Sequence, residues 1–331
     1  MRPLLAVVFV CSASAATRAA DYPPLPAAAS SLGAIECDGY LYVYGGHAGK
    51  THSYDTESVL GTFHRLKIEG GKAWEKLPSG PILQGLNLAS HKGKVYRVGG
   101  MSPLNKPGEP ADNVSLDDAS VYDPKAGTWS ALPKLPAGRS SHDLVAVGDK
   151  LVVVGGWQMR GKAEGSKWHD TALSLDLSAK EPKWESIPQP FQRRALTAAV
   201  LGTKVYVIAG LTADAASTKQ VDILETATGK WSTGPAIPGS DRVGFSPAAT
   251  VVEGKLIVNT SAGPLFRLTE KGDAWEKVGT VPTTRMVARI VPAGKNAVLV
   301  VGGAGKGGNV SAVERVEIAE KGEPVVASGG N

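Results

Sequence analysis

The chain is poor in cysteine and has no long apolar segment. Cys11 and Cys37 are the only thiols among its 331 residues, and Cys11 lies in an N-terminal stretch that we expect to be removed. A single remaining thiol excludes an internal disulfide, so the packing of the core must stabilise the fold. No apolar run approaches the roughly 20 residues that a membrane-spanning helix needs. We therefore expect no membrane insertion.

The N-terminus has the pattern of an export signal. Arg2 precedes the apolar run from Leu4 to Val10, and the small residues of "CSASAATRAA" follow. This order is typical of a secretory signal peptide, although a buried N-terminal strand is the alternative. We predict that residues 1–20 are a signal peptide, that residues 21–331 form the folded domain, and that the protein is periplasmic or secreted.

A large charge of one sign is also missing. The 36 basic and 31 acidic residues give a formal net charge of +5, and removing Arg2 and Arg18 with the signal peptide leaves 34 basic residues. The chain has no basic run and no aromatic stripe interleaved with basic residues. We therefore predict no nucleic-acid partner.

Motifs for metals and nucleotide cofactors are equally absent. The sequence has no His-Glu-x-x-His or Cys-x-x-Cys pair, no glycine-rich phosphate loop that opens a helix, and no Gly-x-Ser-x-Gly nucleophile elbow. Each of these patterns supplies ligands or backbone donors that the corresponding chemistry requires. We predict no metal and no cofactor.

Aromatic residues are few, but five tryptophans recur at regular intervals. The spacings are 55, 55, 47 and 44 residues, between Trp74, Trp129, Trp184, Trp231 and Trp275. Glycine doublets follow the same rhythm, at Gly45-Gly46, Gly99-Gly100, Gly155-Gly156 and Gly302-Gly303, with Ala209-Gly210 and Thr260-Ser261 in the remaining positions. Short β-branched runs joined by Gly, Asp and Lys turns lie before each doublet, which indicates β-hairpins.

The repeated unit resembles the kelch repeat. The order strand, Gly-Gly, loop and "VYDPKAGTW" (Val121 to Trp129) carries the resemblance. It implies an all-β, six-bladed kelch-type β-propeller, with a Leu- and Val-rich solenoid as the alternative fold. We expect first strands to begin near Leu32, Leu86, His142, Leu196, Pro247 and Val287. The last unit has no Trp strand, and we expect "EPVVAS" rather than "DYPPLP" to supply its outer strand.

The linker into each unit and the loop after each glycine doublet should lie on one face, because antiparallel strands alternate their connections. The linkers carry arginines whose planar forks suit a carboxylate. We predict ligand-binding residues at the channel mouth: Arg139, Arg194, Arg242 and Arg285, with Trp157 and Trp168. Blades 1 and 2 have Ser31 and Gln84 near that register. The alternative role for these arginines is bonding to backbone carbonyls between blades.

The loops after the first three doublets are long and contain polar and aromatic residues. The layout also resembles the exported bacterial N-acetylneuraminate epimerase (sialic acid mutarotase) family, through the signal peptide, the lack of disulfides and "TVPTTRMVARIVPAG". The chain lacks that family's long insertion near the fourth blade. The resemblance implies an isomerase that needs proton donors and acceptors, for which His47, His142 and His169 are the candidates.

The sequence therefore favours a secreted propeller that binds an acidic carbohydrate or a protein partner. A sugar epimerase and a purely structural protein-interaction module are the alternatives.

Overall fold

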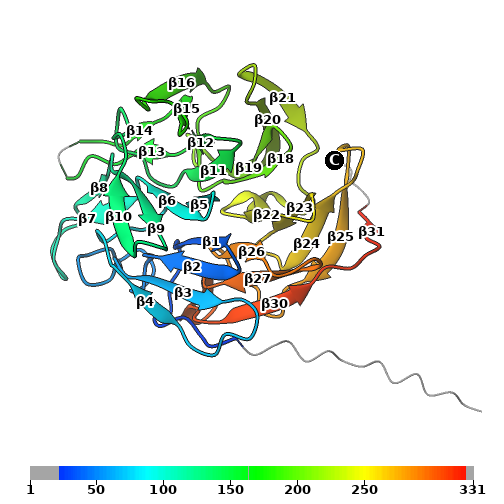
Figure 1. Ribbon diagram of the computed structural model, residues 1–331, viewed down its shortest axis with the longest axis horizontal. Helices are drawn as coiled ribbons and strands as arrows, with labels where there is room; N and C mark the ends of the chain where they lie inside the picture. Colours follow the sequence, from blue (N-terminus) through cyan, green and yellow to red (C-terminus); the bar gives the residue numbers. More distant parts are fainter. Residues whose placement is uncertain (1–21, 163, 326–331) are drawn as a thin grey trace, which may run out of the picture.

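Six antiparallel sheets surround a central axis in the computed structural model, which describes residues 22–162 and 164–325 (Figure 1). Blade 1 contains β1 (Gly33–Cys37), β2 (Tyr40–Tyr44), β3 (Phe63–Lys67) and β4 (Glu75–Leu77). Blade 2 contains β5 (Leu88–His91), β6 (Lys94–Val98), β9 (Ala119–Asp123) and β10 (Thr128–Ala131). Blade 3 contains β11 (Asp143–Val147), β12 (Lys150–Val154), β15 (Thr171–Asp176) and β16 (Trp184–Pro188). This architecture confirms the predicted all-β, six-bladed propeller.

The remaining blades continue around the ring. Blade 4 contains β17 (Arg193–Arg194), β18 (Thr197–Leu201), β19 (Lys204–Thr212), β20 (Ser217–Glu225) and β21 (Lys230–Gly234). Blade 5 contains β22 (Ala248–Val252), β23 (Lys255–Asn259), β24 (Pro264–Leu268) and β25 (Trp275–Thr280), and blade 6 contains β26 (Arg289–Pro292), β27 (Ala297–Val301) and β30 (Val313–Glu317). The helical part of the described chain is one short turn, η1 (Asp241–Gly244), and no helix there is long and apolar enough to cross a membrane.

Short two-stranded ribbons extend from three blades on the face where the linkers enter. They are β7 (Met101–Pro103) with β8 (Asn113–Ser115), β13 (Trp157–Gln158) with β14 (Lys167–Trp168), and β28 (Ala304–Gly305) with β29 (Gly308–Asn309). On the opposite face, tight turns join the first two strands of a blade. Asp38 and Gly39 have φ values of 50° and 79°, and two successive positive φ values favour glycine in the second position.

The hydrophobic core is divided among the six seams between blades. Each buried apolar cluster combines residues from two neighbouring sheets, and the cluster that contains Leu32 and Leu299 joins blade 1 to blade 6. The five repeated tryptophans pack in or against five of these clusters. Each indole Nε1–H also donates to a proline carbonyl at 2.7–3.1 Å, in the pairs Trp74–Pro23, Trp129–Pro78, Trp184–Pro133, Trp231–Pro188 and Trp275–Pro235.

The prediction for the outer strand of blade 6 is wrong. The C-terminal strand β31 (Glu323–Pro324) pairs with β25 of blade 5, and the described part of blade 6 has three strands. Two contacts favour this placement: Lys277 Nζ lies 3.3 Å from a carboxylate oxygen of Glu323, and Val325 packs against the cluster between blades 4 and 5. The predicted signal peptide and residues 326–331 of the C-terminal run lie outside the described residues.

Candidate functional site

A ring of backbone hydrogen bonds fixes the six linkers at one end of the channel. Each linker has one residue with φ between 47° and 62° just before its first strand, namely Ser31, Gly85, Ser141, Ala195, Ser246 and Val287. Five of these residues donate their N–H groups to the carbonyl oxygen of the counterpart in the preceding blade, at 2.6–3.0 Å. These positive-φ residues serve as the reference point in each linker. We call the residue immediately before the reference residue the rim position, and the residue two places before it the seam position.

The rim residues meet the loops that follow the glycine doublets. Ser30 pairs with His47, Gln84 with Met101, Ser140 with Trp157, Arg194 with Leu211, and Met286 with Ala304. Linkers and loops therefore share one face of the propeller, which is the arrangement predicted from strand alternation. This face is the candidate functional site.

Three arginines occupy the seam position. Arg139 and Arg285, which we predicted at the mouth, are 2% and 3% exposed, and burial lowers the pKa of both guanidiniums. Arg139 donates to the carbonyl oxygens of Gly155 (3.0 Å) and Thr171 (2.8 Å). Arg285 forms a 2.6 Å ion pair with Glu314. Arg139 thus bonds to backbone carbonyls, as in the alternative role, but within its own blade and not between blades, and Arg285 bonds to a carboxylate of its own blade.

Arg193, rather than Arg194, is the third seam arginine. It donates to the carbonyl oxygen of Gln220 and to the buried carboxylate of Asp222. Arg242, the remaining predicted arginine, is exposed in η1, two residues before the seam position of its linker. Of the four predicted arginines, two thus lie in the seam position, Arg194 lies in the rim position, and Arg242 lies in η1.

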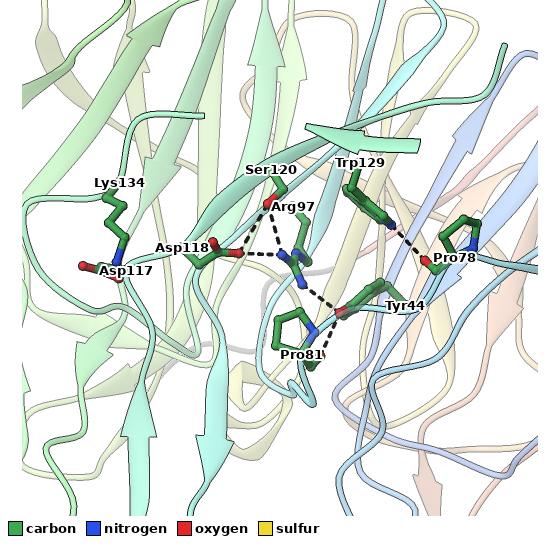
Figure 2. A network of polar contacts seen from close by, with 9 residues as sticks. All are labelled: Tyr44, Pro78, Pro81, Arg97, Asp117, Asp118, Ser120, Trp129 and Lys134. Atoms are coloured by element: carbon green, nitrogen blue, oxygen red, sulfur yellow. Dashed lines mark hydrogen bonds and ion pairs between the residues drawn. The ribbon is translucent and has the colours of Figure 1, made fainter. Parts of the chain in front are cut away.

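Blade 2 has Leu83 in the seam position and supplies a guanidinium from a strand instead. Arg97 of β6 donates to Tyr44 Oη (2.7 Å), to Asp118 (2.5 Å) and to Ser120 Oγ (3.1 Å) (Figure 2). The guanidinium also lies 5.3 Å from the ring of Trp129, whose indole points toward the neighbouring linker (Figure 2). Burial of guanidiniums against carbonyl and carboxylate oxygens is thus a recurring structural feature of the seams.

Arg194 is different because it lies in the rim position. Its guanidinium carbon is 4.1 Å from the ring centroid of Trp157 and 5.7 Å from that of Trp168, within the range of cation–π contact. The two tryptophans are paired across the β13–β14 ribbon, and their rings are tilted by 55° with centroids 5.6 Å apart. Within residues 22–162 and 164–325, the Arg194 side chain has no hydrogen-bond partner, and its Nε is buried. The buried indole N–H of Trp157 also lacks a partner there.

Tyr54 and His47 from the blade 1 loop complete the polar surface around Arg194. Their rings meet edge to face with centroids 4.8 Å apart. Burial raises the pKa of the Tyr54 hydroxyl, while a hydrogen bond with the Gln84 side chain and the charge of Arg194 oppose that rise. Asn105 of blade 2 holds this loop by donating to the Tyr54 carbonyl oxygen at 2.9 Å. Aromatic side chains from the loops of blades 1 and 3 therefore lie near the guanidinium.

The three candidate catalytic histidines lie at two depths. His47 is at the rim, but it is 4% exposed and its Nε2 contacts the Ser53 carbonyl oxygen at 2.8 Å. His142 and His169 are buried near Arg139, and their pKa values fall to about 3 and about 4, chiefly because burial disfavours the charged imidazolium. Both imidazoles are therefore neutral at physiological pH, and a catalytic role for any of the three stays a prediction.

A polar contact that the sequence did not suggest crosses the channel beneath the rim. Arg289 at the start of β26 donates to the carbonyl oxygens of Leu32 (3.2 Å) and Leu86 (2.8 Å), and lies 3.4 Å from the buried carboxylate of Asp143. One side chain of blade 6 thereby bonds to blades 1, 2 and 3. Farther along the inner strands lies a cavity of about 270 Å³ lined mainly by small apolar residues. Within the described chain, no three His, Cys, Asp or Glu side chains gather as metal ligands.

Comparisons with known proteins agree with the fold. A family model for the kelch motif matches residues 85–136 and 192–237. Mouse Kelch-like protein 35 is 26% identical over 172 residues, covering 52% of this chain and 25% of that protein. Rat Kelch-like protein 7 is 32% identical over 103 residues, covering 30% of this chain and 16% of that protein. The Kelch-like protein terF of Aspergillus terreus is 23% identical over 280 residues, covering 81% of this chain and 59% of that protein.

A solved structure of YjhT superposes with a TM-score of 0.72 at 17% sequence identity, covering 91% of this chain and 98% of that one. The chain spans a quarter or less of the first curated relatives it matches, so the likeness concerns the repeat and not those whole proteins. The kelch-motif matches, these relatives and the arrangement of the blades lead to one conclusion. This chain is a six-bladed kelch-repeat β-propeller.

Proposed function

We propose that this propeller is exported and binds a carboxylate-bearing carbohydrate at the channel mouth, with Arg194 as the anchor for the carboxylate. The observation that carries the proposal is the pair of unpartnered donors at one point of the rim, Arg194 and the Trp157 indole. Leaving a half-buried guanidinium without an acceptor is costly, and a carboxylate fits its planar fork with two charge-assisted hydrogen bonds. The buried arginines of the seams also have unpartnered Nε atoms, but each has an acceptor for at least one Nη group, which Arg194 lacks within the described residues.

The surroundings of Arg194 favour a sugar over a simple anion. Trp157, Trp168 and Tyr54 present aromatic surfaces that can stack on the apolar face of a pyranose ring. Gln84 and the Tyr54 hydroxyl supply donors and acceptors for ring hydroxyls beside the guanidinium. A protein partner could offer the same carboxylate from an Asp or Glu side chain, and that alternative is an outcome of the test.

Intrinsic tryptophan fluorescence tests the proposal, because Trp157 and Trp168 report on the site directly. Titration with glucuronate and N-acetylneuraminate should change the emission saturably, while glucose and N-acetylglucosamine should not. Arg194→Lys should weaken binding about tenfold or more, because an ammonium cannot reproduce the bidentate fork. Arg242→Lys, an exposed arginine of the next linker, is the matched control and should bind as the wild type does. Absence of binding by both acids, or equal binding by the neutral sugars, would overturn the proposal.

An isomerase activity is a second candidate, and the position of Tyr54 favours it. The charge of Arg194 acts on the Tyr54 hydroxyl, so a phenol would stand near a sugar whose carboxylate is bound at Arg194. Exchange between anomers of the same sugar acids can be followed by magnetisation-transfer NMR with catalytic amounts of protein. Faster exchange that disappears in Tyr54→Phe, with ligand affinity retained, would support the activity. An unchanged exchange rate with wild-type protein would exclude it for these substrates.

A further inference from the structure

Blade 6 has an open outer edge. Blades 1 to 5 each have at least four strands, whereas the described part of blade 6 ends at β30. Alternate residues of an antiparallel strand direct their N–H and C=O groups away from the neighbouring strand. Within the described residues, no backbone group of Val313–Glu317 bonds to anything other than β27. Such an edge is a template for an added strand.

Two of the five complete blades show a side-chain arrangement that would suit this edge. In blade 5, Trp275 opposes Leu268 and the next residue, Glu276, opposes Arg267, with a 2.6 Å ion pair. Blade 1 repeats this arrangement, because Trp74 precedes Glu75, which pairs with Arg65 at 2.7 Å. In blades 1 and 5, a fourth strand with the dipeptide Trp-Glu thus meets a third strand that has an arginine followed by an apolar residue, whereas in blade 3 the glutamate opposes Ser174.

The third strand of blade 6, β30, has an arginine followed by an apolar residue, as the third strands of blades 1 and 5 do. Arg315 opposes the third residue of β27, as Arg65 and Arg267 oppose the third residues of β2 and β23. Val316 follows it, in the place of Leu66 and Leu268, and is 7% exposed. Without a fourth strand, Arg315 bonds to Glu317 of its own strand (2.7 Å) and to the Ala293 carbonyl oxygen (2.8 Å), and its charge is further stabilised by the Tyr22 hydroxyl.

Every Trp-Glu dipeptide in the sequence already belongs to the fourth strand of another blade. All seven tryptophans lie within the described residues, and the three Trp-Glu pairs belong to the fourth strands of blades 1, 3 and 5. The C-terminal β31 shows that a short extended segment can add to the outer strand of a blade, but it does so on blade 5. Within residues 22–162 and 164–325, no strand pairs with the outer edge of β30, and the sequence holds no further Trp-Glu dipeptide for it.

We infer that β30 is a docking edge for an extended segment of a partner protein in which an aromatic residue is followed by an acidic one. The segment adds antiparallel to β30, with its aromatic side chain opposite Val316 and its carboxylate opposite Arg315. Backbone hydrogen bonds supply affinity, and these two side chains supply specificity, as in other cases of strand addition. This edge is separate from the channel mouth, so the inference does not depend on the proposed carbohydrate site.

The synthetic peptide KAWEKLPS, which copies residues 72–79 of this chain, is the probe, with blocked ends and a fluorescent label. Fluorescence anisotropy should detect binding to the wild-type protein. The peptide with Trp replaced by Ala should bind more weakly, and Arg315→Glu should weaken binding of KAWEKLPS about fivefold or more, because it places like charges opposite each other. The charge-reversed peptide KAWKKLPS should regain affinity for Arg315→Glu, which separates recognition from misfolding. Lys204→Glu, an exposed change on blade 4, is the control.

Hydrogen exchange locates the contact. Amides of residues 313–317 that point outward should exchange rapidly in the free protein and become protected when KAWEKLPS is added. Three results would each overturn the inference: no binding at millimolar peptide, an affinity that Arg315→Glu leaves unchanged, or outward amides that are already protected in the free protein.

Discussion

His142 should make the protein sensitive to mild acid, and its removal should relieve that sensitivity. The imidazole is 1% exposed, and neither ring nitrogen has a partner within the described residues. Burial, together with the charges of Arg139 and Arg289, lowers its pKa from 6.5 to about 3. Because the folded pKa lies below the unfolded one, stability is fully present above pH 6.5 and falls as the pH drops toward 3.

The size of this effect follows from the two pKa values. Between pH 7 and pH 5 the protonated fraction of this histidine rises from about a quarter to nearly one in the unfolded chain and stays near zero in the folded chain, which corresponds to about 2 kcal/mol. The equivalent position is leucine in blades 1, 2 and 4, as Leu32, Leu86 and Leu196. His142→Leu therefore keeps an apolar side chain that this position accepts elsewhere in the ring.

Urea titrations of the wild type and His142→Leu at pH 7 and pH 5 measure the difference. The free energy of unfolding of the variant should fall by about 2 kcal/mol less than that of the wild type over this interval. His52→Leu, at an exposed histidine of the blade 1 loop, should leave the pH dependence unchanged. If the wild type and His142→Leu lose equal stability between the two pH values, the imidazole is not held neutral and the reasoning fails.

Three further outcomes can be checked with single variants or intact protein. Trp129→Ala should lower the free energy of unfolding by about 3 kcal/mol in a denaturant titration, and Trp129→Phe by about 1 kcal/mol through loss of the bond to Pro78; an unchanged stability of Trp129→Phe would exclude a role for the indole N–H. Arg193→Ala should cost about 3–5 kcal/mol because it leaves the buried Asp222 carboxylate unpaired, whereas Arg194→Ala should cost less than about 1 kcal/mol; similar losses would contradict the seam and rim assignment. Mass spectrometry of exported protein should find an N-terminus between Ala16 and Asp21, and an intact Met1 would refute the predicted signal peptide.

The repeat was readable from the sequence because its physical requirements recur with it. Five of the six seams contain a large flat side chain, so Trp129 and its counterparts appear in each of the first five blades, and the glycine doublets recur with them. The exact register of the linkers was not readable. Arg193 and Arg194 are adjacent, so the register decides which of them lies in the seam. The register depends on the positive φ of Ala195, which is 50°, and an alanine does not indicate a positive φ in the sequence as a glycine would. Only the hydrogen-bonded ring decides which arginine faces the seam.

Two other features depend on contacts that are distant in sequence. Arg289 reads as part of an apolar inner strand, and its bonds to blades 1, 2 and 3 arise only when the ring closes. The C-terminal run was assigned to blade 6 because that unit lacked a strand. The contact of Glu323 with Lys277 and the packing of Val325 place it on blade 5 instead. Both outcomes reflect tertiary contacts that override a local pattern.

The central claim is that Arg194 binds the carboxylate of a sugar acid, and a double-mutant cycle on the ligand and the protein tests it most directly. Calorimetry would compare glucuronate and its neutral amide on the wild type and on Arg194→Gln. If the guanidinium and the carboxylate bond to each other, removing either should weaken binding by about 1.5–3 kcal/mol, and removing both should cost little more than removing one. If the two losses simply add, the carboxylate does not meet Arg194 and the binding account is wrong.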